Sequence, residues 1–197
     1  MIKRSAPTKK APKSFLAKPW SLSPEEMWEA DELGNARDLA STRKGDKDKF
    51  GAVGGEYIHQ LGARGEAVFS KATGLPWHKA INRYSRPDVG EFEVKTRTLH
   101  SYDLLVRPKA KFPHALVTGT GPSFIIWGWI DARDAFRQEW LKNYGEDRPP
   151  AYFVPKSALL SIDDIPTRLG GGHWTDSWLD DPEEKWRLLY DRGGAAQ

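Results

Sequence analysis

The sequence predicts an α/β protein with a mixed, largely antiparallel sheet flanked by helices, and with irregular extensions at both ends. Two observations carry this prediction. Apolar residues recur at helical spacing between residues 57 and 72, which indicates a helix. From residue 88 the pattern changes to short apolar runs separated by turn sequences, which indicates strands. A helix that precedes a set of strands is most simply built as one α/β domain, and 197 residues suffice for one substantial core.

Two helices are expected ahead of the strands. A polar helix extends from Ser23 to about Thr42, and Ser23 with Glu26 forms the pattern of a capping box at its start. The second helix carries the apolar stripe and contains Gly62 and Gly65. Because glycine lowers helix propensity, we expect both glycines to mark a close approach of a neighbouring element.

Five strands are expected after the helices. Their sequences, in order, are VGEFEVK, YDLLVR, HALVTGT, SFIIWGWI and AYFVP. The segments RPKAKFP and GTGPS are expected to be turns between them. Residues 125–130 are apolar almost throughout, so this segment is placed in a central strand that is covered on both faces.

The first 22 residues are expected to form a basic arm that does not fold alone. The opening 24 residues contain no acidic side chain and these basic ones: Lys3, Arg4, Lys9, Lys10, Lys13 and Lys18. Two interpretations stay open, a solubilising tail and an arm that binds a polyanion without sequence preference. In the second interpretation, the candidate nucleic-acid-binding residues of the arm are Lys3, Arg4, Lys9 and Lys10.

The remainder of the chain is expected to form one domain over residues 23–190, with its core at about 55–160, followed by a disordered tail at 191–197. Three tryptophans interrupt the polar C-terminal segment, and we expect them to hold it against the domain or against a second subunit. A homodimer is therefore one of the arrangements left open. The three tryptophans are Trp174, Trp178 and Trp186.

Composition excludes several classes of site. The chain has no cysteine, so neither disulfides nor thiolate metal sites can form. No apolar run is long enough for a membrane-spanning helix, and the N-terminus lacks the apolar core of a secretory signal, so a cytoplasmic location is expected. The sequence has no phosphate-binding loop and no metal-binding histidine pair. The histidines expected at the surface or the core edge are His59, His78, His100 and His114.

The strongest chemical signal is the stretch RPDVGEFEVKTR at residues 86–97. In an extended strand, Glu93 and Lys95 share one polar face while the alternate residues point into the core. Asp88 is out of phase with Glu93, but Gly90 can supply a bulge or kink that brings the two carboxylates together. The sequence therefore predicts two carboxylates and one ammonium group at one place on the protein surface.

Two close carboxylates stay ionised together only beside a compensating cation. An all-oxygen pair suits Mg²⁺ or Mn²⁺ better than zinc, so Asp88 and Glu93 are the candidate metal ligands. Lys95 is then able to orient a water molecule or to offset charge on a phosphate, and Arg97 on the same face is a candidate phosphate-binding residue. These are the parts that phosphodiester hydrolysis needs.

The stretch resembles the signature of the PD-(D/E)XK nuclease superfamily, with Pro87-Asp88 followed by Glu93-Val94-Lys95. The gap between the two parts is short for that superfamily, and the tyrosine motif of processive recombination exonucleases is absent. The resemblance covers roughly residues 55–155 and extends to uncharacterised phage-encoded members. It implies a restriction-endonuclease-like core, and for a phage-encoded member it implies the host cytoplasm. It also implies a further glutamate on the preceding helix, Glu66, as a third catalytic and metal-binding carboxylate.

The resulting expectation is a Mg²⁺- or Mn²⁺-dependent nuclease that acts on DNA, with endonuclease favoured over exonuclease activity. Its catalytic residues are Glu66, Asp88, Glu93 and Lys95. Two alternatives stay open: a nucleic-acid-binding module of the same fold without catalysis, and a structural or assembly protein whose basic arm contacts nucleic acid. An intact carboxylate pair favours the enzyme, since a binding module has no need to keep like charges together.

Overall fold

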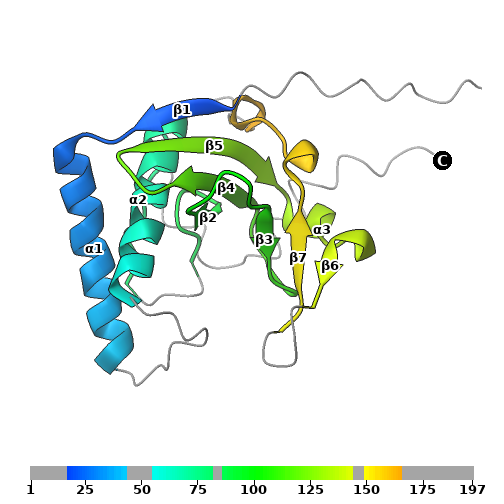
Figure 1. Cartoon of the computed structure of the whole chain (residues 1–197), viewed down its shortest axis with the longest axis horizontal. Coiled ribbons are helices and arrows are strands. Elements are labelled where there is room, and N and C mark those ends of the chain that lie inside the picture. Colours follow the sequence, from blue (N-terminus) through cyan, green and yellow to red (C-terminus); the bar gives the residue numbers. More distant parts are fainter. Residues whose placement is uncertain (1–16, 44–54, 82–85, 144–148, 166–197) are drawn as a thin grey trace, which may run out of the picture. The chain divides into compact units, whose positions relative to one another are not determined.

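The computed structural model describes residues 17–43, 55–81, 86–143 and 149–165. The fold is α/β, with a mixed sheet flanked by helices (Figure 1). The helices are α1 (Pro24–Arg43), α2 (Gly55–Thr73) and α3 (Ala132–Ala135). The strands are β1 (Lys18–Ser21), β2 (Glu93–Arg97), β3 (Leu104–Val106), β4 (His114–Gly119), β5 (Ser123–Ile130), β6 (Leu141–Lys142) and β7 (Ala151–Val154). Short 3₁₀ turns lie at Gln138–Trp140, Lys156–Ala158 and Ile162–Asp164.

The strands form two sheets rather than the single sheet that the sequence suggests. The larger sheet has the order β1-β5-β4-β2, in which β2 pairs with β4 in parallel and the other pairs are antiparallel. The smaller sheet is antiparallel and has the order β3-β7-β6. The expected mixed, largely antiparallel character is therefore confirmed, and β5 lies inside the larger sheet as expected.

Both expected helices and the strand segments from residue 104 onward are confirmed in type and place. The capping box at the start of α1 is present, because the backbone N–H of Ser23 donates to Glu26 Oε2 at 2.7 Å and the backbone N–H of Glu26 donates to Ser23 Oγ at 3.2 Å. Along the described segments, no helix combines the length and the apolar character that crossing a bilayer requires.

Strand β1 is not expected from the sequence, which predicts that its residues belong to the basic arm. Lys18–Ser21 pair with Ser123–Ile126 of β5 in antiparallel register. Ser21 Oγ and Ser123 Oγ lie 3.0 Å apart. The physical reason is that β5 would otherwise present an unpaired edge, and the last residues of the arm satisfy its backbone groups. The arm residues 1–16 and the tryptophans of residues 166–197 lie outside the described residues.

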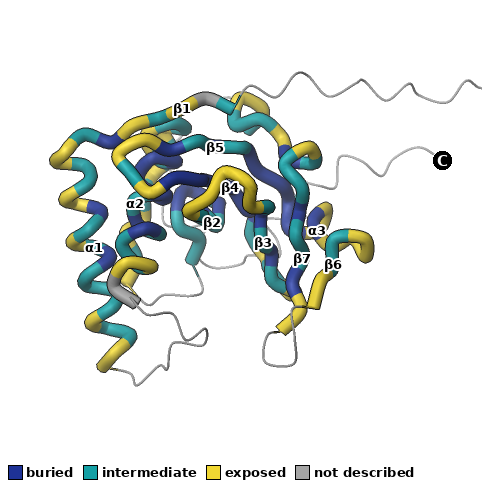
Figure 2. The backbone as a smooth tube through the Cα atoms, viewed as in Figure 1, coloured by how far each residue is buried: buried dark blue, intermediate teal, exposed yellow. Residues whose placement is uncertain are grey.

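The interior has two apolar regions, on opposite sides of β4 and β5. Figure 2 shows β4 and most of β5 as buried. On the side of α2, the ring of Phe92 packs edge-on against Phe69 and Trp129, with ring centroids 5.4 and 5.5 Å apart. On the other side, the smaller sheet and α3 enclose a second cluster. Its buried members are Leu104, Val106, Leu116, Ile130, Ala135, Val154 and Leu159.

Helix α2 lies directly on β2, and this contact depends on Gly65. A Cβ atom at Gly65 would lie 2.8 Å from the Cβ of Thr96 and would overlap its hydroxyl oxygen. The expected close approach is therefore confirmed at Gly65. It is wrong at Gly62, where a Cβ would meet no atom within 4 Å. The contact between α2 and β2 sets the distance between the helix and the strand that carry the candidate site residues.

Replacing Gly65 with alanine is expected to destabilise the protein by about 2 kcal/mol, because the hydroxyl oxygen of Thr96 is buried at this contact and the added methyl overpacks it. Gly62→Ala is the matched control in the same helix, and it is expected to be neutral or stabilising by up to about 1 kcal/mol through helix propensity. Urea unfolding of the two variants measures the difference. Equal stabilities would contradict the tight packing of α2 on β2.

Candidate active site

A tight turn, rather than a bulge in a continuous strand, brings Asp88 close to Glu93. The backbone N–H groups of Asp88 and Val89 both donate to the Phe92 carbonyl, at 2.9 and 3.1 Å, and the N–H of Phe92 donates back to Val89 at 2.8 Å. Gly90 at the turn has φ +55°, a value that favours glycine. The expected strand over VGEFEVK is thus wrong in its first half, since the chain reverses there and β2 begins at Glu93. Gly90 still plays the part predicted for it, because it allows the two carboxylates to approach.

Asp88 is held at the free edge of β2 by the backbone. Its Oδ2 accepts a hydrogen bond from the N–H of Val94 at 2.8 Å. On the other edge of β2, the N–H of Glu93 donates to the Pro113 carbonyl at 2.9 Å as part of the pairing with β4. Asp88 therefore satisfies a backbone group that an edge strand leaves without a strand partner.

Glu93 and Lys95 follow the alternation that the sequence predicts. Phe92 and Val94 are each 5% exposed and point into the core, while Glu93 and Lys95 lie on the more open face of β2. Lys95 Nζ donates to Glu93 Oε2 at 2.8 Å. The ammonium group and the carboxylate thus form a pair on one face, as expected for residues two apart in a strand.

Glu66 faces this pair from α2, and it is only 4% exposed. Arg37 of α1 binds it through two hydrogen bonds, Nη1 to Oε1 at 2.6 Å and Nη2 to Oε2 at 2.9 Å. Trp77 Nε1 donates to Oε2 at 2.9 Å. The Nε of Arg37 also donates to the Ala80 carbonyl at 2.9 Å, which fixes the guanidinium in place. The charge of Glu66 is therefore compensated within the protein by a bidentate arginine.

A cavity of about 360 Å³ collects these groups, and we call it the acidic cavity. Its lining includes Glu66, Asp88, Glu93 and Lys95, so the structure brings together all four residues that the sequence predicts to be catalytic. Gly62 faces the same cavity, which explains why a Cβ there would meet open space. The remaining lining residues are Arg37, Ile58, His59, Ala80, Arg86 and Val94.

The other predicted binding residues are not part of the acidic cavity. Arg97 lies at the end of β2, but its guanidinium stacks on Tyr102, 4.6 Å from the ring centroid, and it lines a different cavity. Arg97 therefore does not line the cavity that contains Glu93 and Lys95, contrary to the expectation that these three side chains act together. Its stacking on Tyr102 directs the guanidinium into the other cavity. The arm residues Lys3, Arg4, Lys9 and Lys10 lie outside the described residues.

Burial and like charges raise the pKa of Asp88 to about 7. Desolvation is the largest cause, and the negative charges of Glu66 and Glu93 add to it, against the smaller opposing effects of Lys95 and of the hydrogen bond from Val94. Burial acts to lower the pKa of Lys95, but the attraction of Glu93 and Asp88 outweighs burial and raises it. The cavity thus contains a charged lysine and a carboxyl group that holds its proton up to near neutral pH.

Sequence reasoning missed three residues around the cavity. Arg37 and Trp77 carried no local signal, since only the tertiary fold brings them to Glu66. His114 was assigned to the surface or the core edge, yet it is 4% exposed and pairs with Glu93 in the register of β2 and β4. Burial, followed by the charge of Lys95, lowers the pKa of His114 to about 4, so the ring is neutral and its Nδ1–H donates to the Phe112 carbonyl at 2.8 Å. For Arg37 there is an indirect signal: once Glu66 is expected to be buried, a cationic partner is expected as well, but the sequence does not show which residue it is.

The oxygen donors of the cavity are of the type that Mg²⁺ takes. Within the described ranges, no group of three or more histidine or acidic side chains is arranged to hold a metal ion. Magnesium commonly keeps several waters and uses only one or two carboxylates, and Asp88 with Glu93 supplies that number. Burial is the main cause of the raised pKa of Asp88, and a divalent cation would relieve the second cause, the repulsion from Glu66 and Glu93. A two-carboxylate magnesium or manganese site made by Asp88 and Glu93 therefore fits these residues, while Glu66 is bound by Arg37.

Comparison with known proteins gives no relative: no family model, no curated protein and no solved structure matches the chain.

Proposed function

We propose that this protein is a metal-dependent nuclease of the PD-(D/E)XK type that hydrolyses phosphodiester bonds in DNA. The observation that carries the proposal is the meeting of Asp88, Glu93 and Lys95 in one solvent-accessible cavity, with Glu66 facing them from a helix. The order of elements supports it further, because a helix bearing Glu66 packs on a strand that begins with Glu93 and includes Lys95. A restriction-endonuclease-like core is part of the same proposal.

In this proposal Asp88 and Glu93 hold the metal ion. When bound, Mg²⁺ or Mn²⁺ polarises a phosphoryl oxygen and lowers the pKa of a water molecule. Glu66 is assigned a supporting role, since Arg37 and Trp77 occupy both of its oxygens. Its negative charge still acts on Asp88, whose pKa it helps to raise.

Hydrolysis forms a bond from a water oxygen to phosphorus and breaks the bond from phosphorus to one sugar oxygen. Lys95 is placed to donate to a phosphate oxygen or to the attacking water, because its Nζ lies beside Glu93 and its side chain is 35% exposed. Its raised pKa keeps it protonated at neutral pH. Donors of this kind stabilise the charge that develops on the phosphate in the transition state.

The two alternatives predict different behaviour of the same residues. A binding module or an assembly protein gains nothing from holding Asp88 close to Glu66 and Glu93, and it bears the cost of the repulsion between these carboxylates. A metal-dependent nuclease uses Asp88 and Glu93 as ligands. We therefore favour the enzyme, and we favour endonuclease over exonuclease action as the form to be tested first.

The direct test uses DNA circles, which have no ends and are cut only by an endonuclease. Incubating the full chain with single- and double-stranded circles in Mg²⁺ or Mn²⁺ is expected to give nicked or linear products, and EDTA is expected to prevent them. Linear DNA in a parallel reaction detects an exonuclease. If no divalent metal supports cleavage of circular or linear DNA by the folded protein, the nuclease proposal is wrong.

A further inference from the structure

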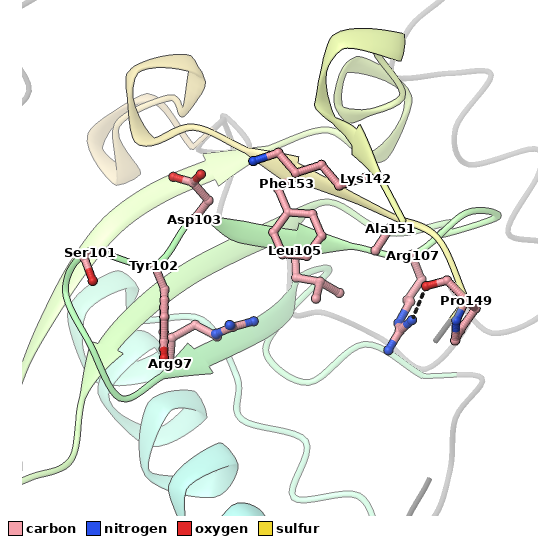
Figure 3. Close-up of a pocket in the computed structure, with 10 residues that line it drawn as sticks. All are labelled: Arg97, Ser101, Tyr102, Asp103, Leu105, Arg107, Lys142, Pro149, Ala151 and Phe153. Atoms are coloured by element: carbon pink, nitrogen blue, oxygen red, sulfur yellow. Dashed lines mark hydrogen bonds between the residues drawn. The ribbon is translucent and has the colours of Figure 1, made fainter. Parts of the chain in front are cut away.

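A second cavity of about 530 Å³ lies beyond the far end of β2, between that strand and the smaller sheet. Figure 3 shows the rings of Tyr102 and Phe153 with the side chains of Arg97, Arg107 and Lys142 around them. The volume is within the range of sites that take small organic groups. We call this the second cavity; its other lining residues are Ser101, Asp103, Leu105, Pro149 and Ala151.

The described residues that line the second cavity carry a net positive charge. Among the residues that the structure describes, three cationic side chains line it against one carboxylate, that of Asp103. Arg97 and Lys142 form no ion pair with a described carboxylate; each lies instead over an aromatic ring, Arg97 over Tyr102 and Lys142 over Phe153 at 5.5 Å. The rings fix the cations in position without neutralising them. A site of this kind attracts an anion.

The rings point to the chemical class of that anion. A free phosphate or an acidic peptide needs cations but has no use for an exposed ring such as that of Tyr102. A nucleotide unit uses both, since its phosphate binds arginine and its base stacks on an aromatic face. Tyr102 is 40% exposed, so its ring is accessible to a base. A base can reach such a ring only when it is not stacked in a duplex, which favours single-stranded nucleic acid.

The position of the cavity connects it to the acidic cavity. Arg97 and Lys95 are two residues apart on the same strand and point to the same side, which separates their Cα atoms by about 6.5–7 Å. This separation is similar to the step between neighbouring phosphates of an extended strand. A strand whose scissile phosphate lies at Lys95 would therefore present its next phosphate to Arg97.

We propose that the second cavity binds an unpaired nucleotide next to the scissile phosphate, with Arg97 on the phosphate and Tyr102 and Phe153 against the base. This inference rests on the proposed nuclease function, and it adds a preference for single-stranded DNA or for duplexes whose ends or junctions open near the cut.

Binding of a fluorescein-labelled oligo-dT to the full chain in EDTA tests the site without cleavage. Arg97→Ala is expected to weaken binding about tenfold and to reduce the log–log salt slope by about 0.7, the value for one single-strand phosphate contact. Tyr102→Ala is expected to weaken binding about 5- to 100-fold, while Tyr102→Phe keeps the ring and binds as wild type. Lys71→Ala is the control, because Lys71 pairs with Glu26 outside both cavities.

Three outcomes would overturn the inference: unchanged oligo-dT affinity in both alanine variants, equal affinity for a blunt duplex of the same length, or equally strong competition by poly-glutamate. Mg²⁺-dependent cleavage by the wild type, measured in parallel, separates the two proposals. If the wild type cleaves and the variants bind normally, the nuclease stands and the second site falls. If binding depends on Arg97 and Tyr102 but nothing is cleaved, the nucleotide site stands and the nuclease falls.

Discussion

Lys95→Ala is expected to lower the rate of DNA cleavage by at least about 10²–10³-fold, the usual cost of removing one preorganised donor to developing charge. Lys95 donates to Glu93 at 2.8 Å, and it is the lysine that lines the acidic cavity in the described part of the chain. The two ligand carboxylates remain in the variant, so the metal should still bind. The measurement is the single-turnover cleavage rate at saturating DNA in Mg²⁺.

The control for Lys95→Ala is again Lys71→Ala, which removes an ion-paired lysine outside the cavity and should cleave at the wild-type rate. Thermal unfolding with Mg²⁺ shows whether each variant is folded. A folded Lys95→Ala protein that retains more than about a tenth of the wild-type rate would remove Lys95 from the catalytic set. If the wild type does not cleave DNA and Lys95→Ala binds DNA more weakly than the wild type, the binding-module alternative is favoured.

Most of the candidate site was predictable because its residues lie close together in the sequence. Asp88, Glu93 and Lys95 lie within one short stretch, and strand alternation alone puts Glu93 and Lys95 on one face. The route by which Asp88 joins them was predicted incorrectly. A glycine between alternating residues fits a bulge or a turn equally well, and the turn forms because Val89 and Phe92 pair with each other.

The parts that sequence could not supply depend on contacts between distant elements. Arg37 reaches Glu66 only because α1 packs on α2, and no periodic pattern specifies that partner. Strand β1 consists of a short segment, KPWS, whose strand character comes from the open edge of β5 rather than from its own composition. Arg97 has the expected phase in β2, but the ring of Tyr102 directs it into the second cavity.

Asp88→Asn is expected to abolish cleavage and to change how stability depends on pH and on metal. The asparagine oxygen can still accept the hydrogen bond from Val94, so the turn should survive. In the folded wild type the pKa of Asp88 is raised from 3.8 to about 7, so the folded state keeps a proton that the unfolded chain loses earlier. The wild type therefore loses stability as pH rises from about 4 to about 7, by at most about 4 kcal/mol, at about 1.4 kcal/mol per pH unit. The variant lacks this loss, so in EDTA it should match the wild type near pH 4 and exceed it at pH 8.

Metal should raise the stability of the wild type at pH 8 towards that of the variant, which in EDTA exceeds it by at most about 4 kcal/mol. Wild type is expected to gain stability by mass action, about 2.7 kcal/mol at a metal concentration a hundredfold above Kd, whereas Asp88→Asn should gain little because it lacks the charge that the ion requires. Thermal unfolding of both proteins with EDTA, Mg²⁺ or Mn²⁺ at pH 4, 6 and 8 makes the comparison. Glu91→Gln is the matched control, since it removes a carboxylate from the same turn that does not line the cavity, and it should respond as wild type does. If Asp88→Asn and wild type have equal metal responses, Asp88 is not a ligand; if their stabilities in EDTA run parallel across pH, the carboxyl group is not held protonated by burial and by its acidic neighbours.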